Sequence, residues 1–162
     1  MNRTIIKVLA CIGYWFIQLT WGALMTIPGL LITLFCIVFL KGKPHKNGFS
    51  YIVEIGRNWG GLELGAVALC GSYHNTSYWD EIRCHEFGHS LFPQHLLMGP
   101  FFPFLVGIPS ACRYWYKIIM SKKGKNFSEN WYYKFWAEKN ASINGTRLIN
   151  WIENKNIVSK YK

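Results

Sequence analysis

Acidic residues are scarce in this sequence, and its cysteines form no pattern. Eight Asp and Glu stand against 18 Lys and Arg among 162 residues, so the formal net charge is +10 at pH 7. Such an excess of cations suits an anionic partner, either nucleic acid or the anionic face of a lipid bilayer. The five cysteines lack CxxC spacing and lie mostly in apolar stretches, which indicates small buried hydrophobic residues. No internal repeat is present, and the length fits a single domain.

Charge is absent from the whole of Val8–Leu40, and basic residues flank this apolar run on both sides. A secretory signal has an apolar region of only about 7–15 residues, followed by a small-residue cleavage site, which is absent here. We therefore expect residues 8–40 to be a retained membrane anchor. Because the basic residues flank apolar segments instead of forming a separate basic face, the expected partner is the lipid bilayer and not nucleic acid.

The topology of this anchor depends on a break within it. About 20 residues span a bilayer, so residues 8–40 have room for one long tilted span or for two short ones. Thr26–Leu30, with the sequence TIPGL, combines a helix-ending proline with a glycine. Basic residues at both outer ends are expected when both ends are cytoplasmic. These features favour a transmembrane hairpin or a broken helix over 8–40, with a single kinked span as the alternative.

A β-hairpin and a helix are expected in the next part of the chain. Between residues 50 and 71, apolar and β-branched residues alternate with polar ones on either side of Asn58–Gly61, which predicts a β-hairpin. Residues 78–92 contain good helix formers, with an Asp–Glu pair near the start and Pro93 after the end. They therefore predict a helix.

Two further helical segments are expected towards the C-terminus. Residues 96–120 are apolar but contain three prolines, which forbid an uninterrupted helix. Irregular backbone at membrane depth is tolerated where it is buried in protein or lines a cavity, so we expect a re-entrant or broken membrane helix. Residues 128–154 predict a C-terminal helix with Ser128 as its N-cap. The expected fold class is mainly α and integral membrane, in one domain over 1–162.

The stretch HEFGHS, His85–Ser90, carries the chemistry. Residues i and i+4 share one face of a helix, so His85 and His89 can present two imidazoles to one metal ion. Glu86 is turned too far to ligate but is close enough to take a proton from a metal-bound water, as in the HExxH motif. A metal lowers the pKa of such a water from about 15.7 towards about 7. Gly88 would let another element pack closely. The alternative is a buried helix whose histidines are hydrogen bonded without a metal.

A catalytic zinc takes three protein ligands and keeps one open position, so a third ligand is needed. His95 lies ten residues after His85, the metzincin spacing, but the glycine that turns the chain in that motif is replaced here by Phe92, which Pro93 restricts further. Glu138 on the expected C-terminal helix is the other candidate. The alternative for Glu138 is a solvated helix carboxylate paired with a lysine.

An HExGH helix followed by a distant helix with Glu-x-x-Ala resembles the gluzincin pattern, particularly the membrane peptidases of the CAAX-prenyl-endopeptidase and heat-shock-peptidase type. The membrane setting also resembles site-2 proteases, which take an aspartate as the third ligand. The segments HEFGHS, GPFFPFLVGIPS and EKNASING are similar to those of a group of small bacterial membrane proteins. The resemblance covers roughly residues 50–148.

The resemblance implies a zincin-like helical core in which His85, His89 and Glu138 hold Zn²⁺ and Glu86 is the catalytic base, with His95 as the alternative third ligand. It also implies an integral-membrane, zinc-dependent peptidase of a bacterial cytoplasmic membrane, which hydrolyses a peptide bond of a peptide or protein substrate with a zinc-activated water.

One position departs from the gluzincin pattern. Gluzincins usually carry an aspartate four residues after the ligand glutamate, where it orients a ligand histidine, and the matching residue here is Ser142. A serine can accept that hydrogen bond but lacks the charge, and loss of such a partner typically weakens metal affinity or activity about 10–100-fold. A second hypothesis is therefore a non-catalytic membrane interaction protein that retains the zincin scaffold.

The substrate contact is expected by analogy alone. Zincins commonly bind substrate as an added strand upstream of the HExxH helix, which here points to the strand near Leu62–Leu69. Glu54 and Glu63 lie nearby in the sequence, but the sequence gives no geometry for either. We therefore assign neither residue to the site.

Overall fold

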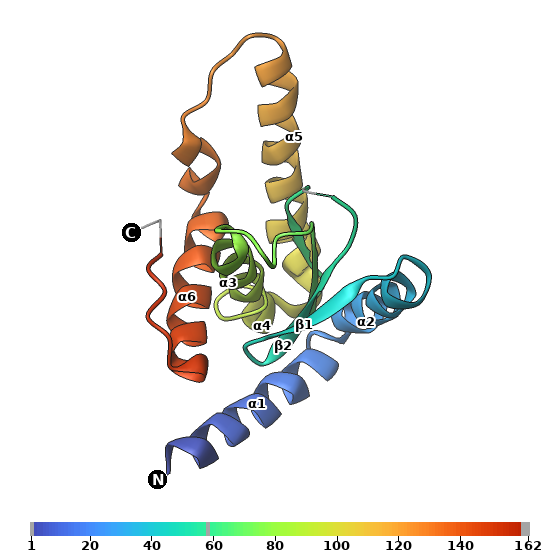
Figure 1. Cartoon of the computed structure of the whole chain (residues 1–162), viewed down its shortest axis with the longest axis vertical. Helices are drawn as coiled ribbons and strands as arrows, with labels where there is room; N and C mark the ends of the chain where they lie inside the picture. Colours follow the sequence, from blue (N-terminus) through green and yellow to red (C-terminus); the bar gives the residue numbers. More distant parts are fainter. Residues whose placement is uncertain (1, 58, 160–162) are drawn as a thin grey trace.

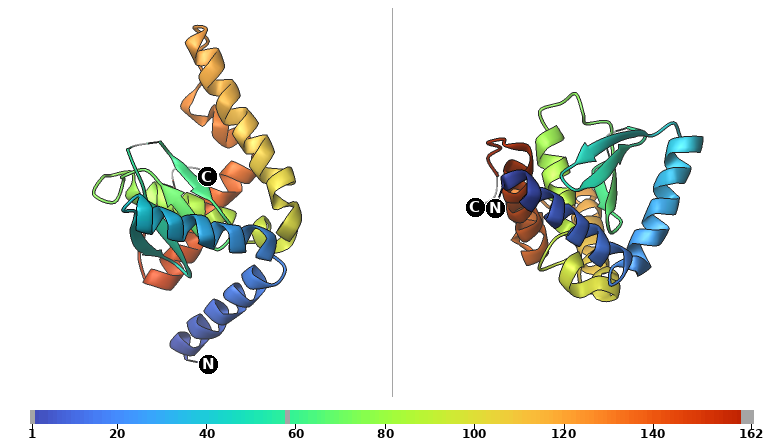
Figure 2. Two further views of the ribbon diagram at one scale, coloured as in Figure 1. Left: turned by 90° about the vertical axis from the view of Figure 1, so that its right-hand side faces the viewer. Right: turned by 90° about the horizontal axis from the view of Figure 1, so that it is seen from below.

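Two helices that meet at a sharp corner form the N-terminal part of the chain. The computed structural model describes residues 2–57 and 59–159, and it is 61% helical with a small four-stranded sheet (Figure 1). Helix α1 (Arg3–Leu19) and helix α2 (Ala23–Phe39) are bent by 97° relative to each other. They diverge from their shared corner in both views of Figure 2. The mainly helical expectation is confirmed.

The break expected at Thr26–Leu30 is wrong, because α2 continues through Pro28. The chain turns earlier, at Thr20–Gly22, where the backbone N–H groups of Thr20 and Gly22 bond back to carbonyls of the last turn of α1. A Cβ at Gly22 would lie 2.8 Å from the ring of His95, so close packing at the corner fixes its place.

No single helix among the described residues is both long and apolar enough to cross a bilayer. Two bent pairs reach the required length and composition only when their halves are taken together, namely α1 with α2 and His95–Phe101 with Pro103–Lys122, which are bent by 97° and 96°.

The sheet contains β1 (Lys43–Asn47), β2 (Ser50–Glu54), β3 (Gly61–Glu63) and β4 (Val67–Cys70), in the spatial order β1-β2-β4-β3. The single hairpin expected over residues 50–71 is wrong: β2 and β4 pair in parallel, and the two antiparallel pairs are β1 with β2 and β3 with β4. Strand β1 reads KPHKN and gives no apolar signal. Gly65, with φ +86°, lies in the tight turn that makes β3 and β4 a hairpin of their own.

Helix α3 (Trp79–His89) carries the HExxH residues and lies between the sheet and α6 (Trp136–Glu153) (Figure 1). The expected helix over 78–92 exists but ends three residues earlier, at His89. Buried side chains from α1, α3 and α6 form the core around it, with Tyr14, Phe87 and Ile149 as its largest members.

Glycines allow α3 and α6 to cross at backbone contact. A Cβ at Gly88 would lie 1.8 Å from the carbonyl oxygen of Ala141, and a Cβ at Gly145 would lie 1.8 Å from that of Cys84. The expectation that Gly88 lets another element pack closely is therefore confirmed, and that element is α6.

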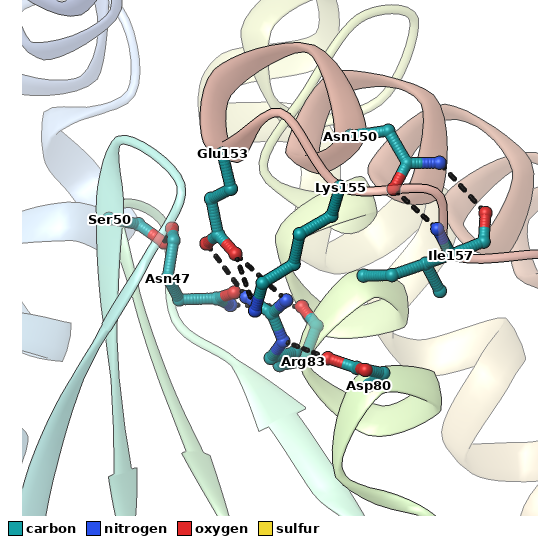
Figure 3. Close-up of polar contacts among 8 residues, drawn as sticks. All are labelled: Asn47, Ser50, Asp80, Arg83, Asn150, Glu153, Lys155 and Ile157. Atoms are coloured by element: carbon teal, nitrogen blue, oxygen red, sulfur yellow. Dashed lines mark hydrogen bonds and ion pairs between the residues drawn. The ribbon is translucent and has the colours of Figure 1, made fainter.

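A buried arginine ties the same two helices together at their other end (Figure 3). The guanidinium of Arg83 donates to both carboxylate oxygens of Glu153, at 2.8 and 3.0 Å, and to Asp80 at 2.7 Å. The carbonyl of Arg83 accepts from the Asn47 side chain at 2.9 Å, which attaches the β1–β2 turn to α3. Bidentate pairs of this kind fix geometry as well as charge, so Arg83 sets the placement of α3 relative to α6 and to the end of β1.

The segment after α3 is broken, as expected for residues 96–120. It consists of α4 (His95–Met98), a 3₁₀ turn η1 (Gly99–Phe101), a π-helical turn η2 (Pro103–Gly107) and α5 (Ile108–Lys122). Helix α5 projects from the rest of the molecule, and the chain returns through η3 (Glu129–Lys134) to α6 (Figures 1 and 2).

The single helix expected over 128–154 is wrong. Phe135 is extended, with φ −70° and ψ 128°, and it separates the 3₁₀ turn η3 from α6, which begins at Trp136. Ser128 precedes η3, and its side chain makes no capping hydrogen bond. The ring of Trp131 packs against Phe127 and under the guanidinium of Arg113, and the second contact joins η3 to α5.

Candidate metal centre

Two imidazoles and a carboxylate meet where α3 crosses α6. The Nε2 atoms of His85 and His89 lie 3.1 Å apart. Oε2 of Glu138, from the first turn of α6, lies 3.1 Å from Nε2 of His85 and 3.6 Å from Nε2 of His89. All three residues are buried, and Glu138 is completely so. They form the one group of potential metal ligands found among the described residues.

These separations fit a single metal ion. In a tetrahedral zinc site with bonds of about 2.0–2.1 Å, two ligand atoms lie about 3.3 Å apart. The three observed separations, from 3.1 to 3.6 Å, bracket that value. Apart from the two imidazoles, Oε2 of Glu138 has no partner among the described residues. A buried carboxylate oxygen and two imidazole nitrogens that face one another are donor atoms that a bound cation could share.

Without a metal, the cluster is held by charge. Burial opposes ionisation of Glu138, but the hydrogen bonds from His85 and His89 hold the pKa of its carboxyl well below the usual value. Burial also disfavours the charged form of His89, yet Glu138 raises the pKa of that imidazole to about 9. The metal-free site therefore contains an ion pair whose proton a metal would displace.

Gln94 orients His89. Oε1 of Gln94 lies 2.7 Å from Nδ1 of His89, and Nε2 of Gln94 donates to the carbonyl of Ala137 at 2.6 Å. The second bond fixes the amide so that its oxygen faces the imidazole, and Nδ1 of His89 is then the donor. This leaves Nε2 with a free lone pair in the neutral ring. Sequence reasoning missed Gln94, because it lies beyond the end of α3 and no helical spacing relates it to His89.

Ser142 contacts His85 as the resemblance implied. Its Oγ lies 2.8 Å from Nδ1 of His85, one turn of α6 after Glu138. The hydroxyl can accept a hydrogen bond from Nδ1 and so leave Nε2 of His85 for a metal. It contributes no negative charge to make the imidazole more basic.

The second oxygen of Glu138 is held from α5 and η3. Ser110 donates its hydroxyl to Oε1 of Glu138, and the hydroxyl of Tyr132 lies 2.5 Å from Oγ of Ser110. Occupation of Oε1 leaves Oε2 directed at the imidazoles. Neither residue was among the predicted site residues, although Ser110 belongs to the GIPS segment of the resemblance. Only the packing of the projecting α5 brings it to the site.

Glu86 lies beside the ligands but is not one of them. Its carboxylate packs against β3, where a Cβ at Gly61 would lie 2.3 Å from Oε1 of Glu86. A larger residue at position 61 would displace the carboxylate from this place. Burial raises the pKa of the Glu86 carboxyl above its usual value, the direction expected of a general acid–base group.

His95 is not in the ligand group. It is fully buried, and its ring packs against Phe102 with centroids 5.3 Å apart, while neither ring nitrogen has a partner in the structure described. The chain leaves α3 at Ser90 and turns so that α4 places this ring against the corner at Gly22. His95 as the alternative third ligand is therefore not supported.

The two acids that sequence reasoning left unassigned have different surroundings. Glu54 is bound by Nε2 of His45 at 3.1 Å and by the backbone N–H of His74 at 2.6 Å. Glu63 is buried on the face of β3 that packs towards α3, and neither of its carboxylate oxygens has a side-chain partner among the residues described. Burial raises the pKa of Glu63 well above its usual value.

Comparison of the chain with protein-family models, with curated proteins and with solved structures found no match. The likeness to gluzincins therefore rests on the motifs, and the function has to be argued from the geometry of the site. That geometry can hold a divalent metal through two imidazoles and one carboxylate, with an unligated carboxyl group alongside.

Proposed function

We propose that this protein is a membrane-bound, zinc-dependent peptidase. The observation that carries the proposal is the convergence of donor atoms from His85, His89 and Glu138 at separations of 3.1–3.6 Å, with Glu86 adjacent but outside the ligand group. A catalytic zinc site has this composition, with three protein ligands of the nitrogen and oxygen type and room for a fourth group.

Each side chain has a separate task in the proposed reaction. When bound, zinc supplies a Lewis acid that polarises the peptide carbonyl and lowers the pKa of water. Glu86 accepts the proton of the attacking water and passes it to the leaving amine, which its raised pKa favours. Gln94 and Ser142 keep the imidazoles in the orientation and tautomer that a metal requires.

The edge of the sheet supports a peptide as the substrate. Strand β3 is the last in the order β1-β2-β4-β3, and it lies against α3 next to Glu86. An extended peptide that adds to the free edge of β3 would pass the site with its backbone paired to the sheet.

The surface supports a lipid bilayer as the second partner. Apolar side chains are exposed along both bent helix pairs, among them Leu9, Ile12, Phe16, Leu31, Leu34, Phe35, Phe104, Leu105 and Trp115. No acidic or basic side chain interrupts residues 8–40. Exposed apolar side chains in such number are typical of a surface that contacts a membrane. We propose insertion of both bent pairs into the cytoplasmic membrane of a bacterium.

A non-catalytic interaction protein on the same scaffold is the second candidate. The observation that favours it is the uncharged hydroxyl of Ser142 at His85, because a weaker partner for the ligand lowers metal affinity or activity.

One experiment separates the two candidates. Wild type, Glu86→Gln and the control Glu81→Gln on the same helix are purified in detergent from the membrane fraction, assayed for zinc and incubated with a peptide library. We expect equal zinc in all three and a loss of about 10²–10⁴-fold in cleavage for Glu86→Gln alone, because an amide cannot accept the proton. Equal cleavage by all three, or none by wild type, would favour the non-catalytic candidate. Full recovery of wild type without detergent would contradict membrane insertion.

A further inference from the structure

A second buried carboxylate lies beside the site and has no role in the mechanism proposed above. Glu63 is 6% exposed, and no side chain among the described residues forms a hydrogen bond or an ion pair with either of its oxygens. Burial of an unpaired carboxylate costs free energy, and native proteins rarely leave such a group without a partner. Two other buried acids do have hydrogen-bond partners, since Glu54 accepts from the N–H of His74 and Glu138 from Ser110.

The strand places Glu63 relative to Glu86. Alternate residues of a strand share a face, so Gly61 and Glu63 both face α3, whereas Leu62 between them is 49% exposed. The Gly61 position contacts the carboxylate of Glu86. The Cα of Glu63 therefore lies about 7 Å further along β3 on the same face. A peptide that pairs with β3 would bring a residue close to the scissile bond within reach of Glu63.

The chemistry of the surroundings selects the ligand. Glu63 belongs to no group of three metal ligands in the structure described. Two carboxyl groups, Glu63 and Glu86, border this side of the site. Neither can carry positive charge, and a nearby cation favours their ionised forms, so the surroundings disfavour an anion and suit a cation. His85 and His89 retain 9% and 8% exposure, so these two residues are not completely enclosed.

We propose that Glu63 binds a positively charged group of the substrate, either its α-ammonium or a lysine side chain, next to the bond that is cleaved. The inference rests on the proposed function and defines its substrate class: peptides with an amine close to the scissile bond. Glu63 would thus be a specificity-determining residue that forms a buried ion pair only when substrate is present.

The test measures binding, so that it does not depend on turnover. The zinc-loaded Glu86→Gln protein is titrated by calorimetry with alanine-rich hexapeptides that carry lysine or norleucine at a central position, each with a free or an acetylated N-terminus. We expect the charged peptide to bind about 10–100-fold more tightly than its neutral partner, the range of a hydrogen bond to a charged group. If acetylation of the N-terminus weakens binding, the recognised group is the α-ammonium. If replacement of lysine by norleucine weakens binding, the recognised group is the side-chain ammonium.

The second variant identifies the residue responsible. Glu63→Gln in the same background should keep its zinc and its affinity for the neutral peptide but lose the preference for the charged one. Glu54→Gln, which changes a partnered acid of the same sheet, should keep that preference. Equal binding of charged and neutral peptides, failure of all four to bind, or a preference that survives Glu63→Gln with zinc intact would overturn the proposal. Charge-selective binding without cleavage by wild type would support Glu63 while contradicting the peptidase.

Discussion

The hydroxyl of Ser142 lies 2.8 Å from Nδ1 of His85, at the position where a carboxylate would make that imidazole a stronger metal ligand. Ser142→Ala removes the acceptor, and we expect zinc affinity to fall about 10-fold, at the lower end of the range for such partners. Competition with a chromogenic chelator measures this. Thr146→Ala, one turn further along α6, is the control and should leave the affinity unchanged. An unaltered affinity in Ser142→Ala would mean that the hydroxyl does not orient His85.

Gln94 has the equivalent task at His89. Gln94→Leu keeps most of the volume but removes both polar atoms, so Nδ1 of His89 and the carbonyl of Ala137 each lose a partner. We expect zinc affinity to fall about 10–100-fold and the free energy of unfolding to fall by about 1–3 kcal/mol. The same chelator titration and a denaturant melt of metal-free protein test the two effects separately. Full zinc affinity in this variant would contradict the assigned tautomer.

The crossing of α3 and α6 should tolerate no added atom. In Gly88→Ala the new methyl group would lie 1.8 Å from the carbonyl of Ala141, so the helices must separate. We expect a loss of about 3 kcal/mol or more in unfolding free energy, together with loss of zinc. Gly13→Ala in α1 is the matched control, because its Cβ would meet nothing within 4 Å. That substitution should be neutral or stabilising by up to about 1 kcal/mol, and equal effects of the two would contradict the close crossing.

Zinc binding should depend steeply on pH. The pKa of His89 in the metal-free protein is raised to about 9, so this imidazole carries a proton at neutral pH that zinc must displace. Apparent affinity should therefore rise about tenfold per pH unit below pH 9 and level off above it. Chelator competition between pH 6.5 and 9.5 tests this, with the chelator's own protonation corrected. A plateau beginning near pH 6.5, the ordinary pKa of histidine, would contradict the ion pair with Glu138.

Local spacing was enough to predict the half of the site that lies on one helix. His85, Glu86 and His89 occupy α3, so the helical period alone sets their relation. Glu138 lies on another helix far along the chain, and only the resemblance pointed to it. Gln94 and Ser110 could not be found in this way, because the turn after α3 and the return of the chain from α5 bring them to the site.

The sheet was predicted poorly for a similar reason. Residues 50–71 read as strands, but their apolar pattern cannot distinguish an antiparallel neighbour from a parallel one. β2 and β4 pair in parallel because the chain passes through β3 and turns back at Gly65 before it enters β4. This turn packs closely against α2, since a Cβ at Gly65 would lie 2.3 Å from Oγ1 of Thr26. The break predicted at Pro28 was wrong for a similar reason. Helix α2 continues through Pro28, and the corner between α1 and α2 lies at Gly22, where the backbone packs closely against His95.

The contact between Gly88 and Ala141 also bears on how the candidate metal centre is held together. Two of the donor groups come from α3 and the third from α6, so the reach of Glu138 to the imidazoles is set by two backbones that already touch. A disturbance that separates the two helices, even far from the three side chains, would therefore move Oε2 of Glu138 away from both imidazoles at once. The donor group depends in this way on the helix crossing as much as on the donor residues themselves.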